Sequence, residues 1–434
     1  MKVLLIGSGA REVALARKIN SSKLETKLFC WPSSASLARL TDSVPGSVNS
    51  LDSLVDWAAE QKIEVAVVGP EQPLVDGICE KLSAKNIPVF GPNAKAAQLE
   101  GSKSFAKDVM GAAGVPTAAY VTVQNRKDCE TEAFKMLSEH GGCVLKASGL
   151  AGGKGVFVCF SKEDVNAGLD RLYGGMAGAA QTVVVEQVLE GRECSFFVML
   201  GAGDPSVLGF AVDFKRLNDG DRGPNTGGMG CYTPVPWLPA DAADQVLEKV
   251  VRPTVTELSR RGIDYNGFLY VGLMWGAGGP QVVEFNVRFG DPECQIMAVA
   301  DERDWFSLIL NQLGLRPVSE EGRQKPLSEF RKTVGVVLTS NAYPYGEVEN
   351  ISSDITEVVA ADDGAIFGAS ISHKDGKYYN GSGRVMTVVG SGDSFDEARK
   401  QAYDKAIAIR KVWPSAHFRT DIAELVEREE GDLK

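Results

Sequence analysis

The chain has 434 residues, of which 44% are hydrophobic and 24% charged, and its formal net charge is −11 at pH 7. This length exceeds what one hydrophobic core serves and predicts a globular protein of two to four domains. The acidic balance excludes wholesale binding to nucleic acid or to an anionic membrane, although local cations still attract a small anion within a Debye length of about 8 Å.

The cysteines and the apolar runs indicate in which cellular compartment the protein is expected. The eight cysteines stand singly, and no two are spaced as Cys-x-x-Cys. This pattern predicts free thiols in a reducing compartment, without a disulfide framework or a cysteine metal site. The first residues, 1–7, read as a buried strand rather than a signal peptide, and no run approaches the roughly 18 apolar residues of a membrane span. We therefore expect a cytoplasmic protein.

Strand and helix signals alternate over residues 1–101. Apolar runs at 3–6, 27–30, 65–68 and 88–90 predict strands, and the pattern over 11–19 predicts a helix. Strand, turn and helix in repetition are typical of a parallel sheet with crossover helices. The sequence thus predicts a Rossmann-like domain at the amino end.

The pattern changes after residue 101. Segments 181–187 and 194–200 predict paired antiparallel strands, and residues 268–285 predict a hairpin. A loop rich in glycine and polar residues over 215–230 is too long for an ordinary connection and indicates function. Residues 240–261 predict a helix.

The last hundred residues predict a small α+β domain. A polar linker over 314–328 precedes strands at 333–339 and 384–389. Ser394 and Glu397 form the signature of a capping box, which begins a helix. Its apolar face is expected to consist of Phe395, Ala398, Ala402, Ala406 and Ile409.

The first candidate site is Gly7-Ser8-Gly9-Ala10-Arg11, between a strand and a helix. Glycines there let backbone amides approach an anion at the helix amino end, and Arg11 offers a bidentate fork for phosphate. The third glycine of a dinucleotide motif is missing, since its position holds Glu12. A tight turn without a ligand is the alternative.

The second candidate runs from Lys146 to Val156. An apolar strand delivers Lys146, and Gly152, Gly153, Lys154 and Gly155 follow. Such a loop folds over phosphates with its amides inward while the lysines neutralise charge. It lacks the Walker pattern, and a flexible glycine hairpin is the alternative.

A third candidate joins two strands. Glu186 ends one apolar run and Glu193 opens the next. Backbone groups at a strand end suit an adenine edge, and a carboxylate accepts ribose hydroxyls. A solvated turn is the alternative.

The fourth candidate is the strand that carries Glu284, Asn286 and Arg288. Alternation places these three side chains on one face. An acid, an amide and a cation together suit oxygen ligands for Mg²⁺ beside a phosphate clamp. Asp291 and Glu293 add carboxylates shortly afterwards, and an exposed polar face is the alternative.

A fifth candidate begins at Asp213 and Lys215 and continues into the glycine-rich string at 223–230. A cation followed by such a loop suits a second anionic substrate or a closing lid. A disordered surface loop is the alternative.

In this order, the motifs resemble those of ATP-grasp ligases, and more closely those of the phosphoribosylamine–glycine ligase family. The resemblance covers nearly the whole chain, including 67–71, 98–103, 284–293 and Gly-Pro-Asn-Thr-Gly-Gly-Met-Gly at 223–230. It implies a Rossmann-like parallel-sheet domain over 1–101 and an ATP-grasp domain of two α+β subdomains over 102–315. The subdomain at about 120–190 would be mobile, and a small α+β domain would occupy 330–430.

The resemblance also implies roles for residues around ATP. Lys103 and Lys146 would hold phosphates beneath the loop at 152–155, and Arg288 would stabilise the transferring phosphoryl group. Mg²⁺ or Mn²⁺ would bind Glu284 and Asn286. The nucleoside would contact Glu186, Gln187, Leu189 and Glu193, and the other substrates would face Asp213, Lys215, Asn225, Thr226, Gly228, Gly9, Arg11, Gly290, Asp291 and Arg384.

The implied reaction has two steps and uses small-molecule substrates only. Glycine carboxylate attacks the γ-phosphate of ATP to give glycyl phosphate and ADP, and the amine of 5-phosphoribosylamine then displaces phosphate. The product would be the glycinamide ribonucleotide of purine biosynthesis, made by a monomer or small homo-oligomer. Alternatives are an ATP-grasp ligase for another amine and a nucleotide-binding relative without turnover.

Several positions depart from the family pattern, and three of them replace a histidine or an aspartate. Val13 and Gly368 stand where the family has histidine, and Ser148 stands where it has aspartate. Two of them lie in the end domains, which would shape the ribose-phosphate pocket. These departures therefore concern the predicted identity of the amine substrate rather than the predicted use of ATP.

Overall fold

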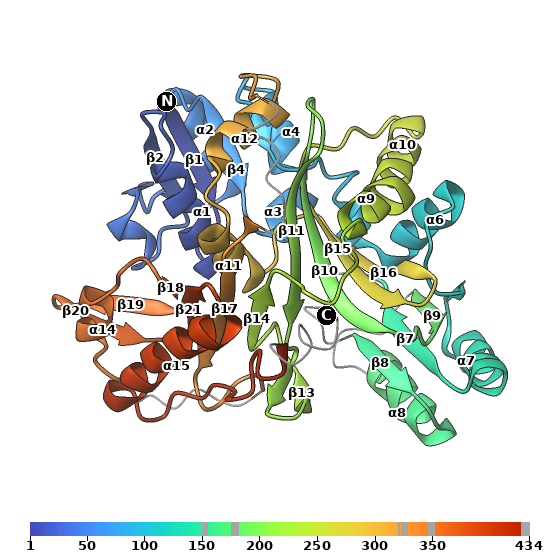
Figure 1. Ribbon diagram of the computed structural model, residues 1–434. Helices are drawn as coiled ribbons and strands as arrows, with labels where there is room; N and C mark the ends of the chain where they lie inside the picture. The colour runs from blue at the N-terminus through green and yellow to red at the C-terminus, as the bar shows by residue number, and fades with distance from the viewer. Residues whose placement is uncertain (150–154, 175–181, 320–321, 323–328, 346–351, 427–434) are drawn as a thin grey trace.

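Three sheets organise the part of the chain that the structure describes (Figure 1). The computed structural model describes residues 1–149, 155–174, 182–319, 322, 329–345 and 352–426. Its strands form a five-stranded, a four-stranded and an eight-stranded sheet, together with two separate hairpins. No helix within these ranges has the length and apolar character needed to cross a membrane. All eight cysteines are free and buried, as predicted.

The amino-terminal sheet is parallel, which confirms the prediction for this part. Alternate residues of β1 belong to different cores, Val3 and Leu5 to one and Leu4 and Ile6 to the other. Both faces are therefore covered, as continuous apolar strands require. The strands, in the order β3-β2-β1-β4-β5, are β1 Lys2–Ile6, β2 Lys27–Trp31, β3 Asp42–Ser43, β4 Val65–Val68 and β5 Val89–Phe90. The helical segments are α1 Ala10–Asn20, η1 Leu37–Arg39, α2 Leu51–Glu60, α3 Glu71–Val75, α4 Ile78–Ser83, α5 Gln98–Gly101 and α6 Lys103–Ala113.

A smaller antiparallel sheet with its own core follows (Figure 1, lower right). Its strands, in the order β6-β9-β7-β8, are β6 Tyr120–Val123, β7 Cys143–Ala147, β8 Val156–Cys159 and β9 Val183–Gln187. Helices α7 (Arg126–His140) and α8 (Lys162–Tyr173) pack on it. This core contains Cys143, Leu145 and Cys159 and is separate from the cores of the larger sheets.

The predicted pairing of segments 181–187 and 194–200 is wrong. Strand β9 pairs with β6 and β7, whereas the next strand pairs with strands of the large sheet. The chain crosses between the sheets at Gly191, where φ is +144° and an added Cβ would lie 2.5 Å from the carbonyl oxygen of Trp275. This close approach turns the chain away from β9.

The large sheet joins the middle of the chain to its carboxyl-terminal part. Its order is β16-β15-β10-β11-β14-β17-β21-β18. Strand β14 pairs with β17, and an added Cβ on Gly230 would lie 2.6 Å from the carbonyl oxygen of Gly335. The strands of the carboxyl-terminal part thus continue the central sheet. Their bounds are β10 Arg192–Leu200, β11 Ser206–Asp213, β14 Gly230–Thr233, β15 Gly267–Gly276, β16 Gly279–Asn286, β17 Lys332–Thr339, β18 Ile366–Gly368 and β21 Arg384–Gly392.

Segment 215–230, expected as one loop, contains a two-stranded hairpin of β12 (Arg216–Asn218) and β13 (Arg222–Asn225). The sequence hid it because the strands are short and the residues polar. A second hairpin joins β19 (Ile371–Lys374) and β20 (Lys377–Asn380).

Helix α15 (Phe395–Val412) forms as predicted. The Ser394 hydroxyl accepts from the Glu397 amide, and the buried residues are those of the predicted apolar face, Phe395, Ala398, Ala402, Ala406 and Ile409. The predicted helix at 240–261 is also present, with a π-helical turn in its middle. The remaining segments are α9 Ala242–Val246, η2 Leu247–Val251, α10 Arg252–Arg260, α11 Glu293–Ala300, α12 Trp305–Gln312 and α14 Thr356–Ala360.

We expect Gly390→Ala to destabilise the fold, because a methyl group there would overlap the backbone of Ala398 and Ala402 on α15. Overpacking of this kind lowers the free energy of unfolding by about 1–3 kcal/mol. Gly278→Ala is the matched control, since an added Cβ there would meet nothing within 4 Å. Urea denaturation of both variants measures the difference, and equal stabilities would show that α15 does not pack closely on β21.

Candidate active site

One face of β16 supplies three of the expected residues. Glu284 and Asn286 lie on the strand, and Arg288 follows its end by two residues. The Asn286 amide donates to Glu284 Oε1 over 3.4 Å, and Arg288 Nη2 donates to Asn286 Oδ1 over 3.2 Å. The predicted alternation is confirmed, because the three side chains contact one another.

The Arg288 guanidinium is paired with two carboxylates for which no role was predicted. Glu71, at the start of α3, lies 3.2 Å from Nε, and Glu100, on α5, lies 3.0 Å from Nη2. Burial acts to lower the pKa of Arg288, but Glu100 and Glu71 outweigh it and raise the pKa. The guanidinium is therefore charged and held in place from two sides. Both carboxylates lie within segments that carried the family resemblance, 67–71 and 98–103, and that was the available signal.

Two buried lysines share the carboxylate of Glu186. The Nζ atoms of Lys146 and Lys107 lie 2.8 Å and 3.3 Å from Glu186 Oε2. Lys146 Nζ also donates to the carbonyl of Val283 over 3.1 Å. Burial lowers the pKa of Lys107 to about 8 despite this partner. Sequence reasoning missed Lys107, although its spacing of four from Lys103 on α6 places both on one helix face.

Lys103 stands at the beginning of α6, opposite the end of β7. Its Nζ donates to the carbonyl of Gly149 over 3.2 Å, and the Ser148 hydroxyl accepts from the Ser104 amide over 3.3 Å. Gly155 accepts from the Ala147 amide over 2.8 Å and so closes the β7–β8 pair. The other expected loop residues, Gly152, Gly153 and Lys154, lie outside the described residues.

Glu284 is ionised although it is half-buried. Burial acts to raise its pKa, but Lys215, Lys146 and Lys103 outweigh it and lower the pKa. Within the described ranges, no group of three or more His, Cys, Asp or Glu side chains is placed to hold a metal ion. Mg²⁺ is often held by one or two carboxylates together with substrate phosphates. The ionised Glu284 carboxylate and the Asn286 amide oxygen are suitable ligands for a divalent ion that arrives with a nucleotide. The nearby lysines are suited to the phosphate groups of that nucleotide.

A second charge cluster surrounds Lys215. Its Nζ lies 3.3 Å from the carboxylate of Asp213 and forms an ion pair with Glu193. In this structure Glu193, expected near a ribose, is thus the counterion of Lys215. Glu293, the first residue of α11, lies close enough to Asp213 for their charges to interact. Burial and the nearby Asp213 raise the pKa of Glu293 to about 7.

The turn after β13 contacts both the lysine cluster and the segment before α11. The amide and hydroxyl of Thr226 each donate to the Lys215 carbonyl over 2.8 Å, and the Gly228 amide donates to the Thr226 hydroxyl over 3.0 Å. Gly228 has φ of +108°, and an added Cβ would lie 2.8 Å from Pro292 Cδ. Only glycine permits this approach. Asn225 is exposed at the end of β13.

Asp291 is surrounded by cations from both ends of the chain. Arg384 Nη1 lies 3.6 Å from the Asp291 carboxylate and donates to its carbonyl over 2.6 Å. Burial acts to raise the pKa of Asp291, but Arg384 and Arg11 outweigh it and lower the pKa. Gly290 precedes it, and an added Cβ there would overlap the Glu293 carboxylate. Four expected residues are thus brought together.

The first glycine turn is filled by a carboxylate of the chain itself. Glu12 Oε2 accepts from the Gly9 amide over 2.7 Å, and Glu12 Oε1 accepts from Arg11 Nε over 2.6 Å. Arg11 Nη1 also donates to the Phe289 carbonyl over 3.2 Å. An added Cβ on Gly69 would overlap Glu12. The glycines therefore make room for Glu12, which already satisfies the amino end of α1.

The end of β9 is partly committed to the sheet. The Gln187 amide donates to the Ala119 carbonyl over 2.9 Å, so this donor is used by the backbone. Leu189 lies beyond the strand end, where its backbone takes no part in the ladder that β9 forms with β6 and β7.

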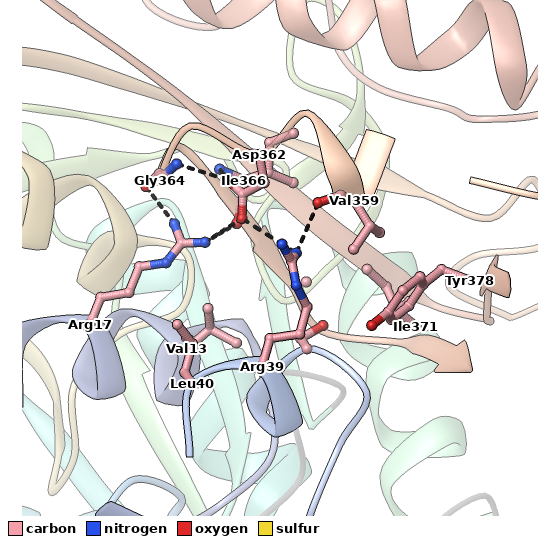
Figure 2. A pocket seen from close by; sticks show the side chains of 12 residues that line it. Val13, Arg17, Arg39, Leu40, Val359, Asp362, Gly364, Ile366, Ile371 and Tyr378 are labelled. Carbon is pink, nitrogen blue, oxygen red and sulfur yellow. Dashed lines mark hydrogen bonds and ion pairs between the residues drawn. The ribbon is translucent and has the colours of Figure 1, made fainter. Parts of the chain in front are cut away.

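A cavity of about 240 Å³ separates the amino-terminal and carboxyl-terminal parts (Figure 2). Arg17 and Arg39 cross it toward the segment 359–366: Arg17 pairs with Asp362 over 2.5 Å, and Arg39 Nη1 donates to the Val359 carbonyl over 2.9 Å. Val13 and Gly368, the two departures from the family histidines, both line this cavity. At Gly368 the room of a side chain is already taken, because an added Cβ would overlap Ser36 and Ile371.

We expect Glu186→Gln to destabilise the protein as well as to weaken nucleotide use. The substitution removes the counterion of two buried lysines, and breaking a buried ion pair costs about 3–5 kcal/mol. Urea denaturation measures the loss, with the exposed Glu190→Gln as control. A variant as stable as the control would mean that Lys146 and Lys107 do not depend on this carboxylate.

The raised pKa of Glu293 predicts a pH dependence of stability. The unfolded carboxyl titrates near pH ~4.3, whereas the folded one holds its proton up to about pH 7. The native state thus binds more protons in this window, so stability is highest below it and falls as the pH rises through it, by roughly 4 kcal/mol at most. Glu293→Gln should flatten the profile between pH 5 and 7.5. Profiles of equal slope for the two proteins would contradict the assignment.

Three family models together match most of the chain. They describe phosphoribosylglycinamide synthetase: its N domain over residues 1–100, its ATP-grasp (A) domain over 101–294 and its C domain over 333–425. The match includes the segments that hold Lys146, Glu284 and Arg384.

Individual proteins give the same result. The chain is 40% identical over 440 residues to a phosphoribosylamine–glycine ligase of Pseudomonas aeruginosa, with 100% of both chains covered. The crystal structure of phosphoribosylamine–glycine ligase from Thermotoga maritima matches with a TM-score of 0.79 and 29% identity, over 98% of this chain and 100% of that one. The biotin carboxylase domain of a Hydrogenobacter thermophilus 2-oxoglutarate carboxylase, at 18% identity and a TM-score of 0.67 over 96% and 90% of the two chains, shares the fold.

Proposed function

This chain belongs to the phosphoribosylglycinamide synthetase family, and on that premise we propose how its own residues carry out the family's reaction. The chain is an ATP-dependent carboxylate–amine ligase of purine biosynthesis, which joins glycine to 5-phosphoribosylamine and forms glycinamide ribonucleotide. The observation that carries the assignment of residues is the polar face of Glu284, Asn286 and Arg288 opposite Lys103 and Lys146.

The division of labour follows the three parts of the chain. We assign residues 1–101 to an amino-terminal domain, 102–315 to the ATP-grasp domain and 330–430 to the carboxyl-terminal domain. ATP would lie between the four-stranded and eight-stranded sheets, because Lys146 comes from the first and Glu284 from the second. The backbone beyond β9, at Leu189, would face the adenine.

The first step transfers a phosphoryl group. A carboxylate oxygen of glycine attacks the γ-phosphorus, the bond to the β–γ bridging oxygen breaks, and ADP leaves with that electron pair. Lys103, Lys146 and Arg288 would neutralise the phosphate oxygens. Arg288 is suited to this because Glu71 and Glu100 fix its guanidinium before the substrate arrives, so no reorganisation is needed during the reaction.

A divalent cation accompanies ATP in this fold, and we propose Mg²⁺ or Mn²⁺ held by Glu284 and Asn286. The related biotin carboxylase domain was solved with the magnesium salt of ADP. When bound, the ion neutralises charge on the phosphate oxygens. The chain's own contribution is to keep Glu284 ionised within a cluster of lysines.

The second step forms the amide. The amine nitrogen of 5-phosphoribosylamine attacks the glycyl carbonyl carbon, phosphate leaves, and the nitrogen loses a proton. Asp213, Lys215 and the loop at 225–228 would orient the glycyl group. Arg11, Arg384 and Asp291, with Gly9 and Gly290 nearby, would form the ribose-phosphate side.

Phosphate release tests the proposal directly. Purified protein with ATP and Mg²⁺ should release phosphate only when glycine and freshly prepared 5-phosphoribosylamine are both present. Release sustained by a different amine would instead favour another carboxylate–amine ligase, with the cavity at Val13 and Gly368 as the place to look for the difference.

Glu284→Gln should lower kcat more than it lowers ATP affinity. The variant keeps the shape of the side chain but loses the negative charge, whose effect is greatest when charge develops in the transition state. We expect a decrease in kcat of about 100-fold or more, with ATP binding followed by calorimetry. Glu163→Gln, on the exposed face of α8, is the control. Unchanged turnover at saturating Mg²⁺ would remove Glu284 from the site.

A further inference from the structure

The β12–β13 hairpin is too small to hold its own shape. Its strands span three and four residues, and the ladder has an irregularity between Arg216 and Asn218. A two-stranded hairpin is marginally stable by itself. Yet the hairpin begins next to Lys215 and ends at the loop that contacts Pro292. The position of this substrate-facing loop therefore needs support from elsewhere.

Arg419 supplies that support from near the carboxyl end. Its side chain is 1% exposed, and Nη1 lies 2.7 Å from the carboxylate of Asp221 at the hairpin tip. The same Nη1 donates to the Arg216 carbonyl over 3.2 Å, and the guanidinium lies 4.9 Å from the centre of the Phe214 ring. Nε and Nη2 bind the Asp421 carboxylate over 2.7 Å and 2.6 Å. The Arg419 guanidinium thus contacts a residue before the hairpin, the hairpin's first residue and its tip.

Neighbouring residues extend the same contact. The amide and hydroxyl of Thr420 donate to the two carboxylate oxygens of Asp219 over 2.8 Å and 2.6 Å. Asp421 Oδ2 accepts from the Gly220 amide over 2.8 Å. His417 Nε2 lies 3.1 Å from the Leu217 carbonyl. Segment 417–421 therefore holds the hairpin along its whole length.

We infer that Arg419 is a positioning residue of the ligase, which fixes the β12–β13 hairpin so that Lys215 and the 226–228 loop meet the glycyl and amine substrates. The inference rests on the proposed function of that loop. Lys215 pairs with Asp213, and the Gly227 carbonyl accepts from Arg384, so a displaced hairpin moves both substrate contacts together. The phosphate-side lysines, Lys103 and Lys146, have no bond to the hairpin among the described contacts of the site.

The expected signature is a split between substrates. Arg419→Lys keeps the charge but cannot hold Asp221, Asp421 and the Arg216 carbonyl at once. We expect KM for glycine and for 5-phosphoribosylamine to rise about tenfold or more, since small misplacements of positioning groups are costly, while KM for ATP stays within about twofold.

A second variant keeps the test independent of folding. Asp219→Ala combined with Asp221→Asn removes the acceptor of Thr420 and the negative charge that pairs with Arg419, and the Asp221 side chain is 70% exposed. Asn tolerates the positive φ of 51° at this position. Arg410→Ala is the control, because Arg410 contacts the same segment through the Phe418 ring, 4.8 Å away, and belongs to α15 rather than to the hairpin.

Trypsin reports the hairpin itself, since Arg216 and Arg222 are cleavage sites within it and Lys215 directly precedes it. The Arg419→Lys variant and the double hairpin variant should both be cut there faster than the wild type and the control, as followed by mass spectrometry. The inference would be overturned if both variants were cut at the wild-type rate and their KM values for glycine and 5-phosphoribosylamine, relative to that for ATP, were unchanged. Lys215→Met separates the proposed role of the loop from the positioning role of Arg419. If Lys215→Met is inactive while the Arg419 and hairpin variants have wild-type KM values, only the positioning role fails. If Lys215→Met is fully active, the proposed role of the loop fails and the inference falls with it.

Discussion

A guanidinium cannot remain buried without counterions, and Arg288 obtains them from Glu71 and Glu100, which lie in the amino-terminal part of the chain. Glu100 also accepts from the Val287 amide over 2.8 Å. Separating the amino-terminal part from β16 would leave these charges unpaired, at a cost of several kcal/mol. The sheet that carries no expected ATP ligand therefore determines where the proposed phosphate-binding face stands.

On the opposite side of the site, too, buried charges depend on counterions. Lys146 and Lys107 depend on Glu186, and Glu284 depends on three lysines for its ionisation. Before ATP binds, the carboxylates neutralise the cations. In the proposed site, phosphate oxygens would then enter a cluster in which each cation is already oriented. Such a cluster would let a chain of net charge −11 bind a highly charged anion locally.

Periodic local signals could be predicted from the sequence, and long-range partners could not. The apolar face of α15, the parallel strands of the first sheet and the alternation of β16 each depend on neighbours within a few residues. The separation of β9 from β10 depends on contacts of Gly191 with a distant strand. The two carboxylates that pair with Arg288 were missed for the same reason, because a counterion shows no period along the chain. Lys107 differs, since its spacing of four from Lys103 on α6 was a periodic signal. Glu12 shows the converse, because its glycine turn was recognised while the group that fills it was not.

The carboxyl-terminal part contributes to the proposed site because it fixes the loop at 226–228 on several sides. Segment 417–421 binds the hairpin before the loop, and the Val337 amide of β17 donates to the Met229 carbonyl just after it, over 3.0 Å. Between these points, Arg384 restrains the loop, because its guanidinium donates to both the Gly227 and Asp291 carbonyls. The amino-terminal part, in contrast, fixes Arg288, the proposed phosphate ligand. In the proposed mechanism the two chemical steps would thus depend on different ends of the chain and would meet at the central sheet, where β11 ends at Asp213 and β16 ends at Asn286.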